Sequence, residues 1–404
     1  MSRPVQKGQT KEMRYDFETL IDRRPAGAEK WNMMVRKKPE VCGDVVPLSV
    51  ADMEFSIAPE IQEALMVYIQ QQIPGYAGAP EGFLESVCAF LQRRHGLQVA
   101  PEELVQTPGI VYALPRAIRA LTERGEGVII MTPVYYPFYR AIANTGREVV
   151  RCPLIYDQGS YAIDFDLLKS LAEKKQNTAL LFCSPHNPVG RVWTAEELQK
   201  TAQICEQYHL GLISDEIHFD LVYPEHVHVS CGALEGALAR RTILCTAPSK
   251  TFNLAGMNLS NLVVRDEMLR KKLIQILRTD ATPMQTPFGY VACQAAYDHG
   301  EAWLEELLAY LDENRRFVAA YFAKELPQLR AVPLEGTYLQ WVDCRALGLD
   351  RQALEALMLA HDLFFDEGYL FGEEGAGFER INLACPRRVL EAALARLKNA
   401  VASL

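Results

Sequence analysis

The chain has few features that direct a protein to a membrane or stabilise it outside the cell. No apolar run approaches the roughly 18–20 residues that a helix needs to cross a bilayer. The segment from Met1 to Arg24 is polar and mixed in charge, unlike a secretory signal. The ten cysteines show no C-x-x-C pair and no repeated spacing, which is typical of mostly buried, reduced thiols. We therefore expect a cytoplasmic protein without disulfides.

Basic runs and metal-ligand spacings are also missing. The 42 Lys and Arg residues are outnumbered by 51 Asp and Glu residues, and basic pairs such as Lys37-Lys38 are short. An acidic chain of this kind is a poor candidate for nucleic-acid binding. His226 and His228, together with His218, have no Cys or carboxylate at the spacing of a zinc site, so we expect no metal.

What remains is an ordinary globular composition, with 49% apolar and 23% charged residues in 404. This length predicts about two domains. From about residue 105, short apolar runs alternate with helical stretches. This alternation predicts a mostly parallel sheet covered by helices on both faces. The expected strands are 128–131, 179–183, 210–214, 242–245 and 262–265, and helices are expected at 59–72, 83–96 and 194–209.

After about residue 285 the pattern changes to longer elements. We expect helices at 301–325 and 351–361, strands at 337–342 and 378–383, and a final helix. The sequence therefore predicts a large α/β domain over 46–288. A smaller α+β domain would combine 289–404 with 1–45, which includes an N-terminal arm.

Polar side chains follow the predicted strands at the points where the strands end. Tyr135, Asn187 and Asp215 come after three of them, and Lys250 lies just beyond a fourth. Ligands of open α/β sheets bind at the carboxyl ends of the strands, so these residues should meet. A lysine with a carboxylate, an amide and an aromatic ring is what pyridoxal 5'-phosphate (PLP) requires.

Each residue has a matching task in such a site. Lys250 would hold the PLP aldehyde as a Schiff base, and Asp215 would pair with the ring nitrogen. Asn187 would donate to the phenolic oxygen, although an Asn before a Pro also suits a turn. Tyr135 would stack on the ring, with Tyr136 as its rival.

The cofactor phosphate needs hydrogen-bond donors at a helix N-terminus. The segment Gly109-Ile110-Val111 opens a predicted helix after Pro108, so the backbone N–H groups of Ile110 and Val111 are candidates. The Ser249 hydroxyl is a further candidate.

These residues in this order resemble fold-type-I PLP enzymes, the aspartate aminotransferase superfamily with its class I and II aminotransferases. Asn187 and Asp215 are 28 residues apart and Asp215 and Lys250 are 35 apart, close to the spacing of that family. The resemblance covers nearly the whole chain. It implies the fold of PLP-dependent transferases.

Several segments resemble the carbon–sulfur lyase branch of this family, the MalY/PatB type. They are Ala51-Asp52-Met53-Glu54-Phe55, Ser214-Asp215-Glu216-Ile217-His218, Ala247 to Asn253, Gly336-Thr337-Tyr338-Leu339 and Tyr369 to Gly375. The resemblance implies a cystathionine β-lyase or cysteine-S-conjugate β-lyase, an enzyme of sulfur amino acid metabolism and methionine biosynthesis. Such an enzyme releases a thiol (homocysteine from cystathionine), pyruvate and ammonia.

The resemblance also implies roles for single residues. Lys250 would remove the Cα proton, and Arg380 would clamp the substrate α-carboxylate. The enzyme would be a homodimer in which Tyr76 reaches the phosphate and the substrate in the neighbouring subunit.

Three departures from the aminotransferase pattern favour the lyase. His218 stands in place of a tyrosine, Asn258 in place of an arginine, and Ala247 in place of a hydroxyl residue that Thr246 could replace. An aminotransferase stays the alternative, as does a lyase that also binds a regulatory protein partner. His218 is either a cofactor neighbour or a core histidine, and Asp52 is either a helix cap or part of the substrate entrance.

Overall fold

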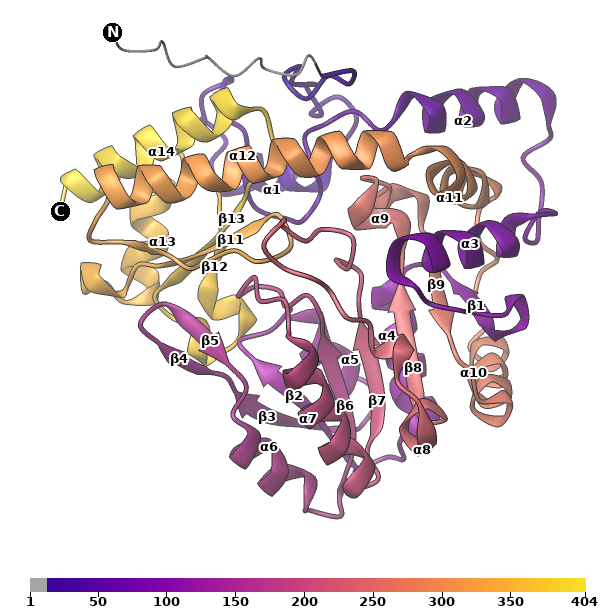
Figure 1. The fold of residues 1–404 in the computed structure, drawn as a ribbon. Coiled ribbons are helices and arrows are strands. Elements are labelled where there is room, and N and C mark those ends of the chain that lie inside the picture. The colour runs from indigo at the N-terminus through magenta and orange to yellow at the C-terminus, as the bar shows by residue number, and fades with distance from the viewer. Residues whose placement is uncertain (1–12) are drawn as a thin grey trace, which may run out of the picture.

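The computed structural model describes residues 13–404, so the first part of the predicted N-terminal arm lies outside the described residues. Figure 1 shows a large sheet with helices around it and a smaller sheet beside it. The helices are α1 (Glu29–Lys37), α2 (Pro59–Gln71), α3 (Phe83–His95), α4 (Ile110–Leu121), α5 (Pro137–Ala143), α6 (Phe165–Ala172), α7 (Ala195–Gln207), α8 (Gly236–Ala239), α9 (Pro248–Thr251), α10 (Glu267–Thr279), α11 (Pro287–His299), α12 (Glu301–Glu325), α13 (Arg351–Ala360) and α14 (Arg387–Ala402).

The large sheet has seven strands and confirms the α/β fold class. In spatial order they are β1 (Leu104–Thr107), β9 (Ser260–Val263), β8 (Thr242–Thr246), β7 (Gly211–Asp215), β6 (Asn177–Cys183), β2 (Gly127–Thr132) and β3 (Glu148–Pro153). All neighbours from β8 to β3 are parallel, and β9 runs antiparallel to both of its neighbours. All five strands that the sequence predicts for this sheet are present, although β9 begins two residues before the expected start.

Side chains of the large sheet alternate between two apolar layers. In β2, Val128 and Ile130 pack in a cluster with α4, α5 and α10, whereas Ile129 and Met131 pack in another with α6 and α7. Because successive residues of a strand point to opposite faces, a strand covered on both sides is apolar throughout. The sheet is therefore buried on both faces, as its short apolar runs predict.

The smaller sheet is antiparallel and has four strands. They are, in order, β10 (Arg330–Ala331), β11 (Leu339–Asp343), β13 (Phe378–Asn382) and β12 (Asp366–Glu367). A hairpin of β4 (Ile155–Asp157) and β5 (Ser160–Ala162) completes the strands of the described residues. The long helix α12 lies beside α14 (Figure 1). One buried apolar cluster joins Phe17, Trp31 and Phe90 to C-terminal residues, so the division into two domains stays a prediction.

Two further expectations concern helix ends and cysteines. The predicted capping box of α7 is present, since Thr194 Oγ1 accepts from the Glu197 N–H at 3.2 Å and Glu197 Oε2 accepts from the Thr194 N–H at 2.8 Å. All ten cysteines are free thiols and most are buried. Within residues 13–404, no helix is both long and apolar enough to span a membrane.

Asn314 in the middle of α12 holds the chain that follows β13. Its Nδ2 donates to the carbonyl groups of Leu383 (2.9 Å) and Cys385 (3.0 Å), and its Oδ1 accepts from Arg387 Nε at 2.8 Å. We expect Asn314→Leu to destabilise the fold by about 2–5 kcal/mol, because it leaves buried polar groups without partners. Urea denaturation should show a lower midpoint. As a control, Lys398→Met removes the exposed pair with Glu325 between α14 and α12 and should leave the midpoint unchanged.

Candidate active site

A cavity of about 240 Å³ lies at the carboxyl ends of the central strands and is called the reactive cavity below. The structure brings nearly all of the sequence-predicted site residues to its wall. They are Ile110, Val111, Tyr135, Asn187, Asp215, His218, Ser249, Lys250 and Arg380, together with Gly109, Tyr136 and Asn258. The residues that follow the predicted strands therefore lie around one cavity, as the sequence predicts.

Lys250 lies in the one-turn helix α9, immediately after β8, and its amine is buried in the wall of this cavity. The Nζ atom donates to the carbonyl oxygen of Ala51 at 2.5 Å. Burial lowers the pKa of the Lys250 amine to about 8, while the Asp52 carboxylate acts in the opposite direction. An amine of this kind is partly neutral near neutral pH, which lets it act as a nucleophile or a base.

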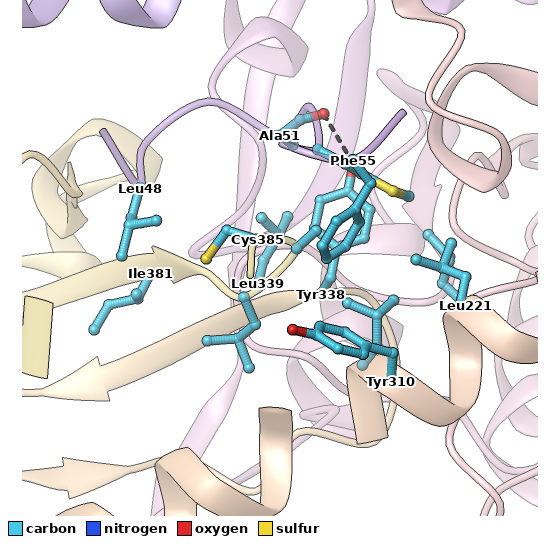
Figure 2. Close-up of a cluster of buried hydrophobic side chains, with 14 of the residues drawn as sticks. Leu48, Ala51, Phe55, Leu221, Tyr310, Tyr338, Leu339, Ile381 and Cys385 are labelled. Carbon is cyan, nitrogen blue, oxygen red and sulfur yellow. Dashed lines mark hydrogen bonds between the residues drawn. The ribbon is translucent and has the colours of Figure 1, made fainter. Parts of the chain in front are cut away.

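Residues 50–55 form a strap that crosses the cavity wall at Lys250. The Ala51 carbonyl also accepts from the Tyr338 hydroxyl at 2.9 Å, the contact that is dashed in Figure 2. Val50 has a φ of +31°, which is strained for a β-branched residue. Asn382 Nδ2 fixes this backbone by donating to the carbonyl groups of Val50 (2.9 Å) and Asp52 (2.7 Å). The Ala51 carbonyl, which accepts the hydrogen bond from Lys250, is thus fixed because the residues before and after it are both held by Asn382.

The strap is anchored by an ion cluster in which Lys30 and Glu54 are buried and Asp52 and Arg23 are half-buried. The Lys30 side chain is 1% exposed, and its Nζ lies 2.9 Å from Asp52 Oδ1 and 2.5 Å from Glu54 Oε1. Arg23 contacts the same two carboxylates, at 2.7 and 3.0 Å. Burial would raise the pKa of Asp52, but Lys30 and Arg23 outweigh it and the pKa lies below its usual value. Asp52 is therefore a half-buried ionic anchor of the strap, a role that differs from both a helix cap and a part of the substrate entrance.

Asp215 is the last residue of β7 and is buried at the floor of the reactive cavity. Burial raises the pKa of its carboxyl group to about 7, although the Ile217 N–H donates to Oδ1 at 3.2 Å and the Lys250 charge also opposes the rise. A carboxyl group with this pKa becomes fully ionised when a cation is placed beside it. The site can therefore receive a protonated ring nitrogen.

Arg380 projects from β13 toward the same cavity and is buried. Its Nη1 donates to Asn187 Oδ1 at 2.9 Å, and its Nη2 forms an ion pair with Asp366, its cross-strand neighbour. Its guanidinium lies 4.7 Å from the Phe371 ring centroid. These contacts fix the plane of the guanidinium, as bidentate binding of a carboxylate requires.

The aromatic residues of the reactive cavity come from three segments, with Tyr112 in α4, the pair Tyr135 and Tyr136, and His218. Tyr135 and Tyr136 both line it, with ring centroids 5.3 Å apart, and the Tyr135 N–H donates to the Asn187 carbonyl at 3.1 Å. The Nδ1 atom of His218 has no hydrogen-bond partner among the described residues. Burial, with the charges of Lys250 and Arg380, lowers the pKa of His218 well below its usual value. His218 is thus a neutral ring facing the cavity rather than a satisfied core histidine.

The other end of the reactive cavity is formed by the N-terminus of α4. Gly109, at φ +97°, directs the chain into the helix, and this φ favours glycine. The first N–H groups of a helix have no partner within it, so those of Ile110 and Val111 suit an anion. The sequence suggests that the Thr246 hydroxyl replaces the one that Ala247 lacks. It is not among these donors, because Thr246 Oγ1 donates to the Asn261 carbonyl at 3.0 Å inside the sheet.

Comparison with known proteins shows the family of this chain. The family model "Aminotransferase class I and II" matches residues 43–397. The chain belongs to this family. It is 35% identical to cystathionine beta-lyase PatB of Bacillus subtilis strain 168 (96% of this chain, all of the relative) and 32% identical to the protein MalY of Escherichia coli K12 (96% and 99%). Among solved structures, cystalysin from Treponema denticola, which contains PLP, matches with 45% identity and a TM-score of 0.94 over 97% of this chain and all of that one.

One predicted site residue, Tyr76, lies outside the reactive cavity, as does His228, for which no metal role was expected. Tyr76, between α2 and α3, is 98% exposed in the single chain. His228 Nε2 lies 2.9 Å from Glu216 Oε2, inside the fold, as part of a buried pair. The first observation leaves Tyr76 available to a neighbouring subunit, and the second gives His228 a structural partner.

Sequence reasoning missed three contributors. Asp366 orients Arg380, Tyr338 holds the strap, and Lys30 anchors it. In the sequence, Tyr338 is only one member of the segment Gly336-Thr337-Tyr338-Leu339, which gives it no role of its own. Asp366 is the direct cross-strand neighbour of Arg380. Its role could be predicted from the sequence only if the register of β12 were known. For Lys30 the sequence offers only a lysine in a polar segment.

The burial of Lys250 yields a titration experiment. In the cofactor-free protein, labelling of Lys250 by fluorodinitrobenzene, followed by peptide mass spectrometry, should show a midpoint near pH 8, whereas an exposed lysine titrates at about 10.4. Asp52→Asn should move this midpoint lower, because the Asp52 carboxylate raises the pKa of Lys250.

The exposed residue Lys271 is the internal control in the same digest. A Lys250 midpoint equal to that of Lys271 would contradict the buried, strap-bound position of the amine.

Proposed function

We propose that the protein is a PLP-dependent carbon–sulfur lyase that cleaves cystathionine or related cysteine S-conjugates. The observation that carries the proposal is the convergence of Lys250, Asp215 and Arg380 on one cavity, in a chain whose relatives include a cystathionine beta-lyase and a PLP-containing cystalysin. The proposed products are a thiol, pyruvate and ammonia.

The residues of the reactive cavity fit PLP. Lys250 would hold the cofactor, Asp215 would face its ring nitrogen, and Asn187 its phenolic oxygen. Tyr135 and His218 would lie against the ring, while Ile110, Val111 and Ser249 would bind the phosphate. When bound, PLP supplies an electron sink for the negative charge that develops at the substrate Cα.

The protein residues themselves supply binding and proton transfer. Arg380, already oriented by Asp366 and Asn187, would bind the substrate α-carboxylate through two parallel N–H groups. The Lys250 amine, with a pKa of about 8, would take the proton from Cα. In the net reaction the Cα–H and Cβ–S bonds break, the sulfur leaves with a proton as a thiol, and water converts the remaining carbons to pyruvate and ammonium.

The decisive experiment is the release of pyruvate without any keto acid. The holoenzyme with L-cystathionine should form pyruvate and homocysteine in equal amounts. Lys250→Ala should lower the rate by about 10²–10⁴-fold or more, the range of a general base. Strict dependence of turnover on an added keto acid would identify an aminotransferase instead and overturn the proposal.

The active unit that we propose is a homodimer. Helix α2 and the segment after it expose Met66, Val67, Ile69, Ile73 and Tyr76, an unusual set of apolar side chains for a free surface. In Figure 1, α2 lies at the periphery of the chain, beside α11. Covering this surface with a second copy would bury the apolar side chains. It would also allow Tyr76 to enter the partner's reactive cavity.

Mixing two inactive variants tests the role of Tyr76. Tyr76→Ala and Lys250→Ala dimers should each be weakly active. Their subunit exchange should restore up to about a quarter of wild-type activity, because half of the dimers then carry one complete site. The measurement is pyruvate release after exchange, with each variant exchanged against itself as the control. No recovery, despite exchange proven by mass spectrometry, would contradict a role across subunits.

Two further proposals concern the domain boundaries and the cellular location. We propose two domains, at 46–288 and at 1–45 with 289–404, and a cytoplasmic location. The ten free thiols, most of them buried, support a reducing compartment.

A further inference from the structure

The strap of residues 50–55 has hydrogen-bond partners on two sides. On one side, the partners belong to the smaller sheet and to the N-terminal segment. They are Tyr338, Asn382, Ala384, Lys30, Arg23 and Trp31. On the other side, Lys250 and Asn253 are the only partners among the described residues. The link between the strap and the segment that carries the reactive lysine therefore depends on these two residues.

Asn253 makes three contacts with the strap through one side chain. Its Oδ1 accepts from the Met53 N–H at 3.0 Å, and its Nδ2 donates to the carbonyl groups of Met53 (3.2 Å) and Phe55 (2.9 Å). Both N–H groups and the oxygen of the amide are thus used by the strap backbone. Asn253 is half-buried and does not line the reactive cavity. Any influence of this amide on the chemistry must therefore pass through the strap.

Asn253 and Lys250 belong to one short segment, residues 248–254. Its backbone is closed by two hydrogen bonds, of 2.9 and 3.0 Å. The Thr251 hydroxyl donates to the buried Asp220 carboxylate at 2.7 Å and so ties the segment to the fold. The φ of Asn253 is +56°, a left-handed conformation that asparagine tolerates better than most residues. Because the segment is closed and anchored, the Asn253 amide keeps a fixed place relative to Lys250.

The Ala51 carbonyl needs a second link to this segment when its hydrogen bond to Lys250 breaks. In the proposed function, Lys250 leaves this carbonyl to hold the cofactor and to take a proton. Tyr338 and Asn382 still bind the strap at that stage, but they belong to the segments of the smaller sheet. Among the described residues, the Asn253 amide is then the hydrogen-bonded link between the strap and the segment of Lys250.

We propose that Asn253 is a positioning residue that keeps the Ala51 carbonyl opposite the Lys250 amine and the strap closed over that amine. The proposal rests on the task that Lys250 has in the lyase function proposed above. Without the amide, the strap would stay attached to the smaller sheet but would be free to move away from residues 248–254. Water would then reach the Lys250 amine, and the amine would lose its fixed acceptor.

Opening of the strap changes the pKa of Lys250 in a defined direction. Burial is the largest influence on this pKa and lowers it. The charges of Arg380 and Lys30 act in the same direction, and Asp52 and Asp215 oppose them. Water beside the amine reduces the effect of burial and screens all four charges. The pKa should therefore rise from about 8 toward the ordinary lysine value of about 10.4.

The test uses Asn253→Gly, because glycine adopts the same φ without strain and lacks only the amide side chain. In the cofactor-free protein, the midpoint of Lys250 labelling by fluorodinitrobenzene should rise by about one pH unit. Amide hydrogen exchange in the peptide that contains Met53 should become faster. In the holoenzyme, kcat for pyruvate release from L-cystathionine should fall by about tenfold or more. The KM should change by less than about threefold, because the contacts that orient Arg380 are kept.

Asn177→Ala is the matched control. Asn177 is a buried asparagine at the amino end of β6, away from the reactive cavity, and its Nδ2 donates to the Leu171 carbonyl at 2.8 Å. This variant should lower the midpoint of urea denaturation but leave the labelling midpoint of Lys250 unchanged. Asn253→Ser is the second variant if Asn253→Gly does not fold. It also removes the amide, so the same upward shift is expected.

Two results would overturn the positioning role of Asn253. One is a Lys250 midpoint that stays near pH 8 or falls when the amide is removed, and the other is an equal rise in Asn177→Ala. The titration uses the cofactor-free protein, so its outcome does not depend on the reaction. Absence of pyruvate from the wild-type holoenzyme would instead contradict the lyase function and leave the titration result to stand.

Discussion

The active-site geometry depends on one contact, the hydrogen bond from the Lys250 amine to the Ala51 carbonyl. A buried amine needs an acceptor, and a backbone carbonyl is a useful one because it cannot titrate or take the proton away. The acceptor must also stay in place when Lys250 moves. This explains why the strap is held by Tyr338, Asn382 and the Lys30–Asp52–Glu54 ion cluster, rather than by Lys250 alone.

The same ion cluster also sets the electrostatics of the site. Burial lowers the pKa of Lys250, and the Arg380 charge acts in the same direction. Asp52 limits this effect, and it can do so because Lys30 and Arg23 keep it ionised. A charge network outside the reactive cavity therefore limits how far the pKa of the Lys250 amine falls, and this pKa stays at about 8. Structural anchoring and pKa adjustment are thus performed by the same residues.

The sequence predicts the fold and much of the site because both depend on local signals. Short apolar strands with polar residues at their ends place Asn187, Asp215 and Lys250 together, whatever the details of packing. The contacts of Lys30 and Asp366 are different, since they join segments far apart in the chain and require an exact register. Thr246 shows the same limit in a single residue. The sequence suggests that its hydroxyl can bind the phosphate, but in the fold this hydroxyl donates to the Asn261 carbonyl.

Strand β13 shows how the register of two short strands sets the charge of consecutive residues. Arg380 and Glu379 point to opposite faces of the strand. The register with β12 gives Arg380 an opposite charge in Asp366 and gives Glu379 a like charge in Glu367. The first pairing orients the clamp of the reactive cavity. The second pairing would be unfavourable between two ionised carboxylates, and burial together with Glu367 and Asp366 raises the pKa of Glu379 well above its usual value. One register therefore produces a charged clamp on one face of the strand and favours a neutral acid on the other.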